Sequence, residues 1–243
     1  MDLRVMTFNI RNGRANDGEN SWPNRRHLTA QVIKKNDPDI IGLQEVYDFQ
    51  LQYLLSQLPE YEFYSIGRDD GERDGEQCTI LWKPDRLHLA DSETFWLSDN
   101  PSEPGSATWG NRTTRICSMV TFKEGFTFLN THLDHESSAA RAKGIALILE
   151  KLPANPWIMV GDLNAEPDSE DLKSLTQSEV IRFHTASQPL GTFHNFTGKS
   201  DGEKIDHIFS SPEWSARAIQ VDRTKDEGLY PSDHYPVTCQ LKN

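Results

Sequence analysis

The stretch Trp157-Ile158-Met159-Val160-Gly161-Asp162-Leu163-Asn164 decides how the rest of the chain is interpreted. Its apolar run is too short for a buried helix and contains β-branched residues, so it predicts a buried strand. At the end of that strand, Asp162 and Asn164 can point to the same side. Such a pair suits the activation of a water, the binding of a phosphate or the approach of a hard metal ion. On its own, however, the pattern is typical of a plain strand and turn, because Asp and Asn are common turn residues.

The flanking segments alternate between strand and helix patterns, which indicates an α/β fold. Residues 91–114 lack either pattern and are expected to be irregular. The predicted helices cover residues 24–36, 47–58, 137–151 and a short segment capped by Asp168-Ser169. The predicted strands cover residues 3–8, 39–45, 78–82, 115–121, 126–131, 157–160, 191–196, 205–210, 216–221 and 237–241. We find no internal repeat, low-complexity tract or linker, so we expect a single domain over residues 1–243.

The composition excludes several classes of function. The net charge of −12 argues against an extended nucleic-acid footprint, which normally needs a basic face. It leaves a phosphate substrate open, because a bound divalent cation can invert the local sign of an acidic pocket. No apolar stretch approaches the length of a membrane span, and residues 1–8 resemble a strand rather than a leader peptide. We therefore expect a cytoplasmic monomer that does not contact membranes.

The cysteine pattern also agrees with a cytoplasmic location. The three cysteines are far apart in apolar surroundings, so we expect reduced core thiols at Cys78, Cys117 and Cys239. No Cys/His spacing suggests zinc.

Polar residues end or interrupt many of the predicted strands. In layered α/β folds the loops at one end of the sheets converge on one cleft, so residues scattered along the chain can meet there. Taken together they favour a functional cleft over a set of unrelated turn and cap residues. The set comprises Asn9, Glu45, His132, Asp134, Asp162, Asn164, Asp206, Asp233 and His234.

With these motifs the chain resembles the endonuclease/exonuclease/phosphatase superfamily, which has the DNase I-like fold, and in particular a bacterial subgroup of it. The resemblance implies a four-layer α/β sandwich, with two packed, mainly antiparallel or mixed sheets flanked by helices. It also implies divalent-metal-dependent hydrolysis of a phosphate ester. The matching segments, in the family order, are Thr7-Phe8-Asn9, Gln44-Glu45, Asn130-Thr131-His132, Gly161-Asp162-Leu163-Asn164, Ile205-Asp206 and Ser232-Asp233-His234.

The resemblance and the chemistry of the side chains suggest a role for each residue. Glu45 and Asn9 are expected to seat Mg²⁺ or Mn²⁺, with Asp233 on the metal side or behind it. The metal would polarise a phosphoryl oxygen and offset charge in the transition state. A helix N-terminal acid remains the alternative for Glu45.

The remaining motif residues are expected to act on the water and the phosphate. Asp162 is the candidate for orienting or deprotonating the attacking water, and Asn164 for holding a phosphate oxygen. His234 can donate to a non-bridging oxygen or act as acid or base, since its unperturbed pKa lies near 6.5. Asp206 would fix its tautomer, as the family's Asp–His pair suggests. His132 is the second imidazole expected to face the phosphate.

Further residues are possible substrate contacts. Arg11 stands where the family's abasic-site repair enzymes carry an Asp, which weakens an abasic-site endonuclease interpretation and leaves Arg11 free to face substrate. An ion pair in this acidic protein is an equally good account of Arg115. The full set of possible contacts is Arg11, Arg115, Asp134, Trp109 and His194. Surface or helix-face positions are expected for His27, His88 and His184.

The substrate remains open at this stage. The first hypothesis is a phosphodiesterase or nuclease acting on short or single-stranded nucleic acid, because aromatic residues in two loops could stack a base. The alternative is a phosphomonoesterase for a small sugar- or inositol-type phosphate. A catalytically silent binding module is disfavoured, because every core polar position carries a competent residue type.

Overall fold

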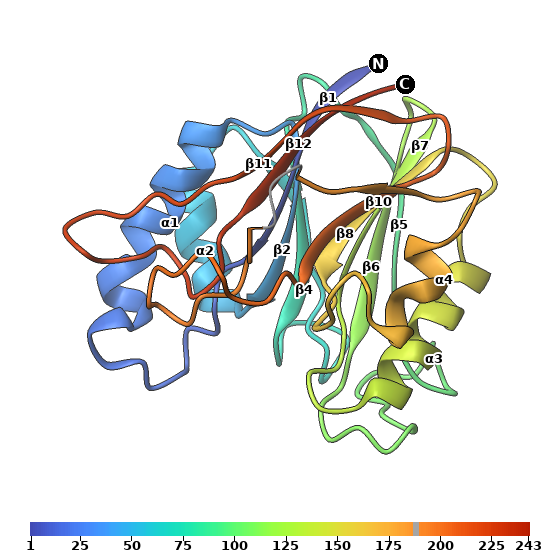
Figure 1. Cartoon of the computed structure of the whole chain (residues 1–243), viewed down its shortest axis with the longest axis horizontal. Helices are drawn as coiled ribbons and strands as arrows, with labels where there is room; N and C mark the ends of the chain where they lie inside the picture. Colours follow the sequence, from blue (N-terminus) through green and yellow to red (C-terminus); the bar gives the residue numbers. More distant parts are fainter. Residues whose placement is uncertain (187–189) are drawn as a thin grey trace.

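Two six-stranded sheets form the centre of the molecule, and helices cover the outer face of each (Figure 1). The computed structural model describes residues 1–186 and 190–243. The first sheet has the order β11 (Ser215–Val221), β12 (Val237–Lys242), β1 (Asp2–Asn9), β2 (Ile40–Val46), β4 (Gln77–Trp82), β3 (Glu62–Tyr64). The second sheet has the order β5 (Leu89–Trp96), β6 (Ile116–Phe122), β7 (Phe126–His132), β8 (Trp157–Asp162), β10 (Asp206–Ser210), β9 (Arg182–His184).

The helices divide between the two outer faces. On the first sheet lie α1 (Trp22–Asn36) and α2 (Asp48–Gln57), and on the second lie α3 (Ser138–Glu150) and the short α4 (Lys173–Thr176) (Figure 1). Two 3₁₀ turns, Gly18–Asn20 and Glu170–Leu172, complete the elements. Helix, sheet, sheet and helix therefore form four layers, which confirms the fold predicted from the motifs. Among the described residues, no helix is long and apolar enough to cross a membrane.

Three apolar cores hold the four layers together, because each sheet buries both of its faces. Between the sheets, side chains such as Val5, Ile40, Phe128 and Val160 interdigitate. A second core packs the first sheet against α1 and α2, and a third packs the second sheet against α3. As expected, the free cysteines are buried: Cys239 in the first of these cores, Cys117 in the third, and Cys78 in a fourth, smaller cluster with Trp96 and Ile116.

One parallel strand pair in each sheet brings the predicted motifs to the same end of the molecule. β1 pairs with β2 and β7 pairs with β8 in parallel, while the remaining pairs are antiparallel. Parallel strands present their carboxyl ends at one edge, so Asn9 and Glu45 emerge together, as do His132 and Asp162. This topology explains why residues far apart in the sequence meet.

Close backbone approach requires glycine beside the strand ends. A Cβ on Gly161 would lie 2.2 Å from the carbonyl oxygen of Thr131, and a Cβ on Gly42 would lie 2.3 Å from Val160 Cγ2 in the facing sheet. Any side chain at these positions would push strands or sheets apart.

A buried polar link joins the two sheets directly beneath the strand ends. Gln44 Nε2 donates to Asn130 Oδ1 at 2.7 Å, and Asn130 Nδ2 donates to the carbonyl oxygens of Leu43 and Thr79. Buried amides of this kind stabilise a structure only when they are hydrogen-bonded, and here they bridge the layers. These two motif residues therefore hold the ends of the sheets in register.

Several local predictions were wrong. Residues 191–196 form no strand, because Asn195 and Phe196 adopt positive φ and only Phe193 makes a bridge, to His234. Residues 91–96, expected to be irregular, belong to β5. The short edge strands β3 and β9 were missed, and the Ser169 side chain makes no cap hydrogen bond.

His184 was expected at the surface but is 7 % exposed. Its ring Nε2 lies 2.7 Å from Ser210 Oγ on the neighbouring strand β10.

Candidate active site

A cavity of about 360 Å³ opens at the end of the sheets where the motifs meet. Acidic, basic and imidazole side chains share its walls, and Phe193 supplies an aromatic face. Eight of the residues predicted from the sequence line it: Arg11, Glu45, Arg115, His132, Asp162, Asn164, Asp233 and His234. The cavity is also lined by residues outside the predicted site set: Asn12, Arg68, Glu76, Thr113, His135, Phe193, Glu203 and Ile205.

The register of the second sheet sets three of the site residues in one row. His132 on β7 pairs with Asp162 on β8, and Asp162 pairs with Asp206 on β10. Residues paired in this way point to the same face of a sheet. The sheet therefore presents an imidazole and two carboxylates side by side.

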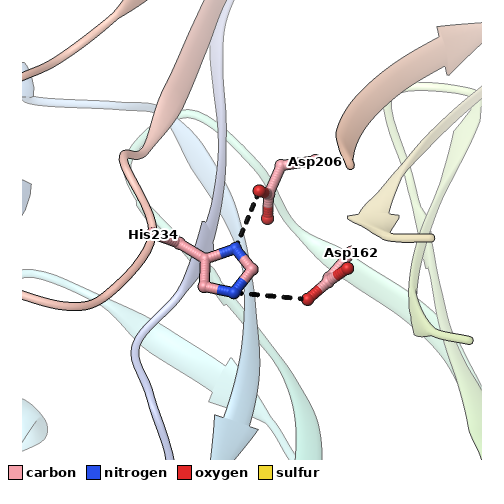
Figure 2. Close-up of side chains that lie close together, drawn as sticks. All are labelled: Asp162, Asp206 and His234. Carbon is pink, nitrogen blue, oxygen red and sulfur yellow. Dashed lines mark hydrogen bonds and ion pairs between the residues drawn. The ribbon is translucent and has the colours of Figure 1, made fainter. Parts of the chain in front are cut away.

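His234 completes this row from the loop before β12. Its Nδ1 lies 2.9 Å from Asp206 Oδ2, and its Nε2 lies 3.7 Å from Asp162 Oδ2 (Figure 2). The Asp206 contact keeps Nδ1 protonated and directs Nε2 toward Asp162. This is the Asp–His pair expected from the sequence.

Burial and neighbouring charges prepare these groups for proton transfer. Burial raises the pKa of Asp162 to about 7, and the charge of Asp206 adds to the rise. Burial alone would lower the pKa of His234, but the charges of Asp206 and Asp162 outweigh it and raise it to about 10. Near neutral pH the structure therefore offers a cationic imidazole beside a carboxylate with the pKa of a general base.

Asn164 holds His132 in its neutral form. Asn164 adopts a left-handed φ of 49°, and its Nδ2 donates to the carbonyl oxygen of Leu133 at 3.0 Å and lies 2.9 Å from His132 Nε2. An amide that donates to this nitrogen requires the ring to accept there. Burial, followed by the charge of Arg115, also lowers the pKa of His132 well below its usual value.

Asn9 connects the two halves of the site. Its Nδ2 donates to Glu45 Oε1 at 3.0 Å and to Asp162 Oδ2 at 2.9 Å, while its Oδ1 accepts from the backbone N–H of Arg11. In this orientation Asn9 positions both carboxylates and presents nitrogen, not oxygen, to Glu45. Its role as a metal ligand needs a rotated amide and stays a prediction.

The acidic side of the cavity has the donor set of a hard divalent cation. Glu45 and Asp233 line it together with Glu76, and the pKa values of Asp233 and Glu76 are raised by burial, with the charge of Glu45 adding to each rise. Carboxylates crowded in this way are stabilised by a cation, and oxygen ligands suit Mg²⁺ or Mn²⁺. The chemistry of these side chains therefore fits a hard divalent cation, and the metal itself stays a prediction.

A second group could also hold a cation. One ligand atom from each of Asp162, Asp206 and His234 lies within 4.8 Å of the others. Because the Nδ1 of His234 is already bonded to Asp206, an ion bound by both would displace that hydrogen bond. Both groups stay candidates for holding the predicted metal.

Three predicted substrate contacts lie outside the lining of the cavity. Trp109 Nε1 donates to Asp99 Oδ1 at 2.8 Å. His194 is 3 % exposed and stacks on Tyr235, with ring centroids 3.9 Å apart. Asp134 is also buried, and its Oδ1 accepts from the backbone N–H of the residues that lead into α3. None of these three side chains lines the cavity.

Comparison with known proteins agrees with this architecture. The family model described as "Endonuclease/Exonuclease/phosphatase family" matches residues 6–234. An endonuclease/exonuclease/phosphatase structure from Bacteroides vulgatus superimposes with a TM-score of 0.93 at 33 % identity, covering 100 % of this chain and 99 % of that one. A mannosyl-6-phosphatase from Bacteroides thetaiotaomicron superimposes with a TM-score of 0.90 at 31 % identity, covering 99 % of this chain and 100 % of that one.

A more distant similarity is to nocturnin of Drosophila melanogaster, at 24 % identity over 311 residues. The alignment covers 99 % of this chain but 47 % of nocturnin, so the chain spans about half the length of that relative. The match over residues 6–234 and the bacterial structures together identify the chain as a member of the endonuclease/exonuclease/phosphatase family.

Proposed function

We propose that the protein hydrolyses the phosphate monoester of a small sugar- or polyol-type molecule with the help of a divalent cation. The observation that carries this proposal is the cavity, which joins Asp162, His234 and a carboxylate cation site to basic side chains in about 360 Å³. That volume lies in the usual range for small-molecule sites. The 31 % identity to a mannosyl-6-phosphatase supports the same substrate class.

Each side chain has a task in this reaction. Asp162 accepts a proton from the attacking water, which its raised pKa permits near neutral pH. His234 donates through Nε2 to a phosphoryl oxygen, while Asp206 holds the ring from Nδ1. Glu45 and Asp233 would hold the divalent cation, since the Asp206–His234 hydrogen bond then stays intact, and the cation would offset charge on the phosphoryl group.

A nucleic-acid end is the second candidate substrate, and one observation favours it. Phe193 lines the cavity, and its ring centroid lies 5.0 Å from that of His234. An aromatic ring in this position can stack a base beside the scissile phosphate. The net charge of −12 disfavours a longer track of nucleotides.

A substrate panel separates these functions. We would measure kcat/KM for sugar monophosphates, nucleotide monophosphates, bis(p-nitrophenyl) phosphate and short single-stranded DNA and RNA, with Mg²⁺ and with chelator. The proposal predicts that sugar monophosphates are hydrolysed best and only with the metal. A preference for the oligonucleotides would establish the second candidate, and an inactive wild type would support a silent binding module.

A further inference from the structure

Arg68 and Arg115 form a basic corner in the wall of the cavity, next to Glu45 and His132. Arg115 directly precedes β6, and Arg68 lies in the loop between β3 and β4. None of the tasks given above to the catalytic residues uses this corner.

Arg115 is buried, and two of its guanidinium nitrogens have no hydrogen-bond partner among the described residues. The residue is 4 % exposed, and its Nη2 lies 2.9 Å from His135 Nδ1. The Nε contacts Asp134 Oδ2 only at 3.8 Å, beyond hydrogen-bond distance. Among the residues that the structure describes, neither Nε nor Nη1 of Arg115 has a hydrogen-bond partner.

Arg68 has a free donor as well. Its Nη1 donates to Glu76 Oε2 at 2.5 Å, while its Nε is 3.8 Å from Asp69 and has no hydrogen-bond partner within residues 1–186 and 190–243. Among the described carboxylates, Arg68 thus has one close partner, Glu76, and Arg115 has none nearer than Asp134 at 3.8 Å. The charge of Arg68 adds to burial in lowering the pKa of Arg115. Buried donors left without acceptors destabilise a protein, and so does the repulsion between two like charges. An anion at this corner would accept from the donors and offset the repulsion.

We propose that the corner of Arg68 and Arg115 binds the oxygens of a phosphate group of the substrate. The unpartnered nitrogens of the two guanidinium groups can each donate to a different phosphate oxygen, whereas a neutral sugar hydroxyl would leave the positive charges uncompensated. The phosphate has two possible sources, the reacting group itself or a second phosphate on the same molecule. This inference rests on the proposed function for the identity of the molecule but not for the binding of phosphate.

The first test measures phosphate binding without catalysis. Inorganic phosphate is titrated calorimetrically into the protein in the presence of chelator, for wild type, Arg115→Gln, Arg115→Lys and the exposed control Arg112→Gln. We expect Arg115→Gln to weaken binding about tenfold or more, Arg115→Lys to weaken it less, and the control to match wild type. Equal affinity of Arg115→Gln and wild type, or no binding by wild type, would overturn the proposal.

The second test distinguishes the two sources. The kcat/KM values for a sugar monophosphate and for the matching bisphosphate are compared in the same variants with Mg²⁺. If the corner holds the reacting phosphate, Arg115→Gln loses activity equally on both; if it holds a second phosphate, only the bisphosphate is affected. Unchanged values for both substrates contradict the proposal.

Two further comparisons distinguish a failure of the binding proposal from misfolding of a variant and from failure of the proposed function. If Arg115→Gln does not fold, Arg68→Gln and Arg115→Lys carry the same comparison, with folding checked by circular dichroism. If wild type binds phosphate through Arg115 but hydrolyses no ester, the proposed function fails and the binding corner stands.

Discussion

At the scale of single residues, Asp162 is the meeting point of the site. It accepts from Asn9 and from the backbone N–H of Asn164, and it lies within 3.7 Å of both His132 and His234. Because one carboxylate touches groups from both sheets, small shifts in either sheet alter its environment. We infer that much of the surrounding hydrogen bonding serves to hold this carboxylate.

The role of Asp206 can be tested with a nearly isosteric change. Asp206→Asn keeps the volume but removes the charge that holds His234 as a cation with Nδ1 protonated. We expect kcat to fall by about 10²–10³-fold. The exposed Asp201→Asn serves as control, and ¹⁵N chemical shifts of the His234 ring report the change in protonation. An unchanged kcat would show that the His234–Asp206 contact is not used in the reaction.

At the scale of elements, site residues at strand ends or in the family motifs were predictable, and residues with neither signal were not. Asn9, Glu45, His132 and Asp162 follow apolar runs, so a strand pattern locates them and parallel pairing brings them together. Arg68, Glu76 and Phe193 lie outside regular runs, where no periodicity indicates which way a side chain points.

The strand wrongly predicted at residues 191–196 has the same explanation, because this segment is an irregular loop. Its β-rich composition is overridden by positive φ at two positions, which only the packing of the surrounding loop determines.

Arg25 connects α1 to the loops that carry the site. The residue is fully buried. All of its hydrogen bonds go to backbone carbonyl oxygens, which belong to the loop after β1 and to the segment that precedes Asp233 and His234. The acceptors are the carbonyls of Ile10, Arg11, Asn20 and Pro231.

Replacing Arg25 should therefore loosen two loops at once. We expect Arg25→Met to lower the free energy of unfolding by about 2–4 kcal/mol, since it leaves buried carbonyls without donors. Urea unfolding measures the change, with the exposed neighbour Arg26→Met as the matched control. Equal unfolding midpoints for the two variants would contradict this role.

The buried histidine of β9 predicts a loss of stability in acid. Burial, followed by the charge of Arg182, lowers the pKa of His184 to about 4, against about 6.5 in an unfolded chain. Between these values the unfolded state binds more protons, so stability falls as pH drops from about 6.5 to 4. Allowing for partial solvent contact, we expect His184 to contribute about 1 kcal/mol to this fall.

The measurement is the free energy of unfolding across that pH range. His184→Gln should show a shallower fall than wild type, whereas the exposed His27→Gln should follow wild type. Parallel curves for wild type and His184→Gln would refute the assignment.

At the scale of the whole molecule, the ordered set of motifs predicted the family and the four layers. What it could not predict is the shape of the cavity, because the walls come from loops whose mutual placement depends on the completed fold. The first hypothesis from the sequence was a phosphodiesterase or nuclease. We instead propose the alternative, a phosphomonoesterase, and the cavity volume and the similarity to a mannosyl-6-phosphatase support it.

The number of charged groups in the bound substrate predicts how kcat/KM depends on salt concentration. A small substrate bound in one cavity contacts few charges, so log(kcat/KM) should fall with log[salt] with a slope of about −1 or shallower. A chain of nucleotides bound over several phosphates would give a slope several times steeper. Assays of the best substrate over a range of KCl concentrations decide between the two.

The central claim is that a divalent cation and Asp162 together hydrolyse a phosphate ester in this cavity. The most direct measurement is phosphate release from a sugar monophosphate by chelator-treated protein during titration with Mg²⁺, for wild type and Asp162→Asn. We predict that wild type is silent in chelator and recovers fully with Mg²⁺, while Asp162→Asn stays about 10²-fold or more below it at every Mg²⁺ concentration. Hydrolysis that persists in chelator, or that survives Asp162→Asn undiminished, would contradict the claim.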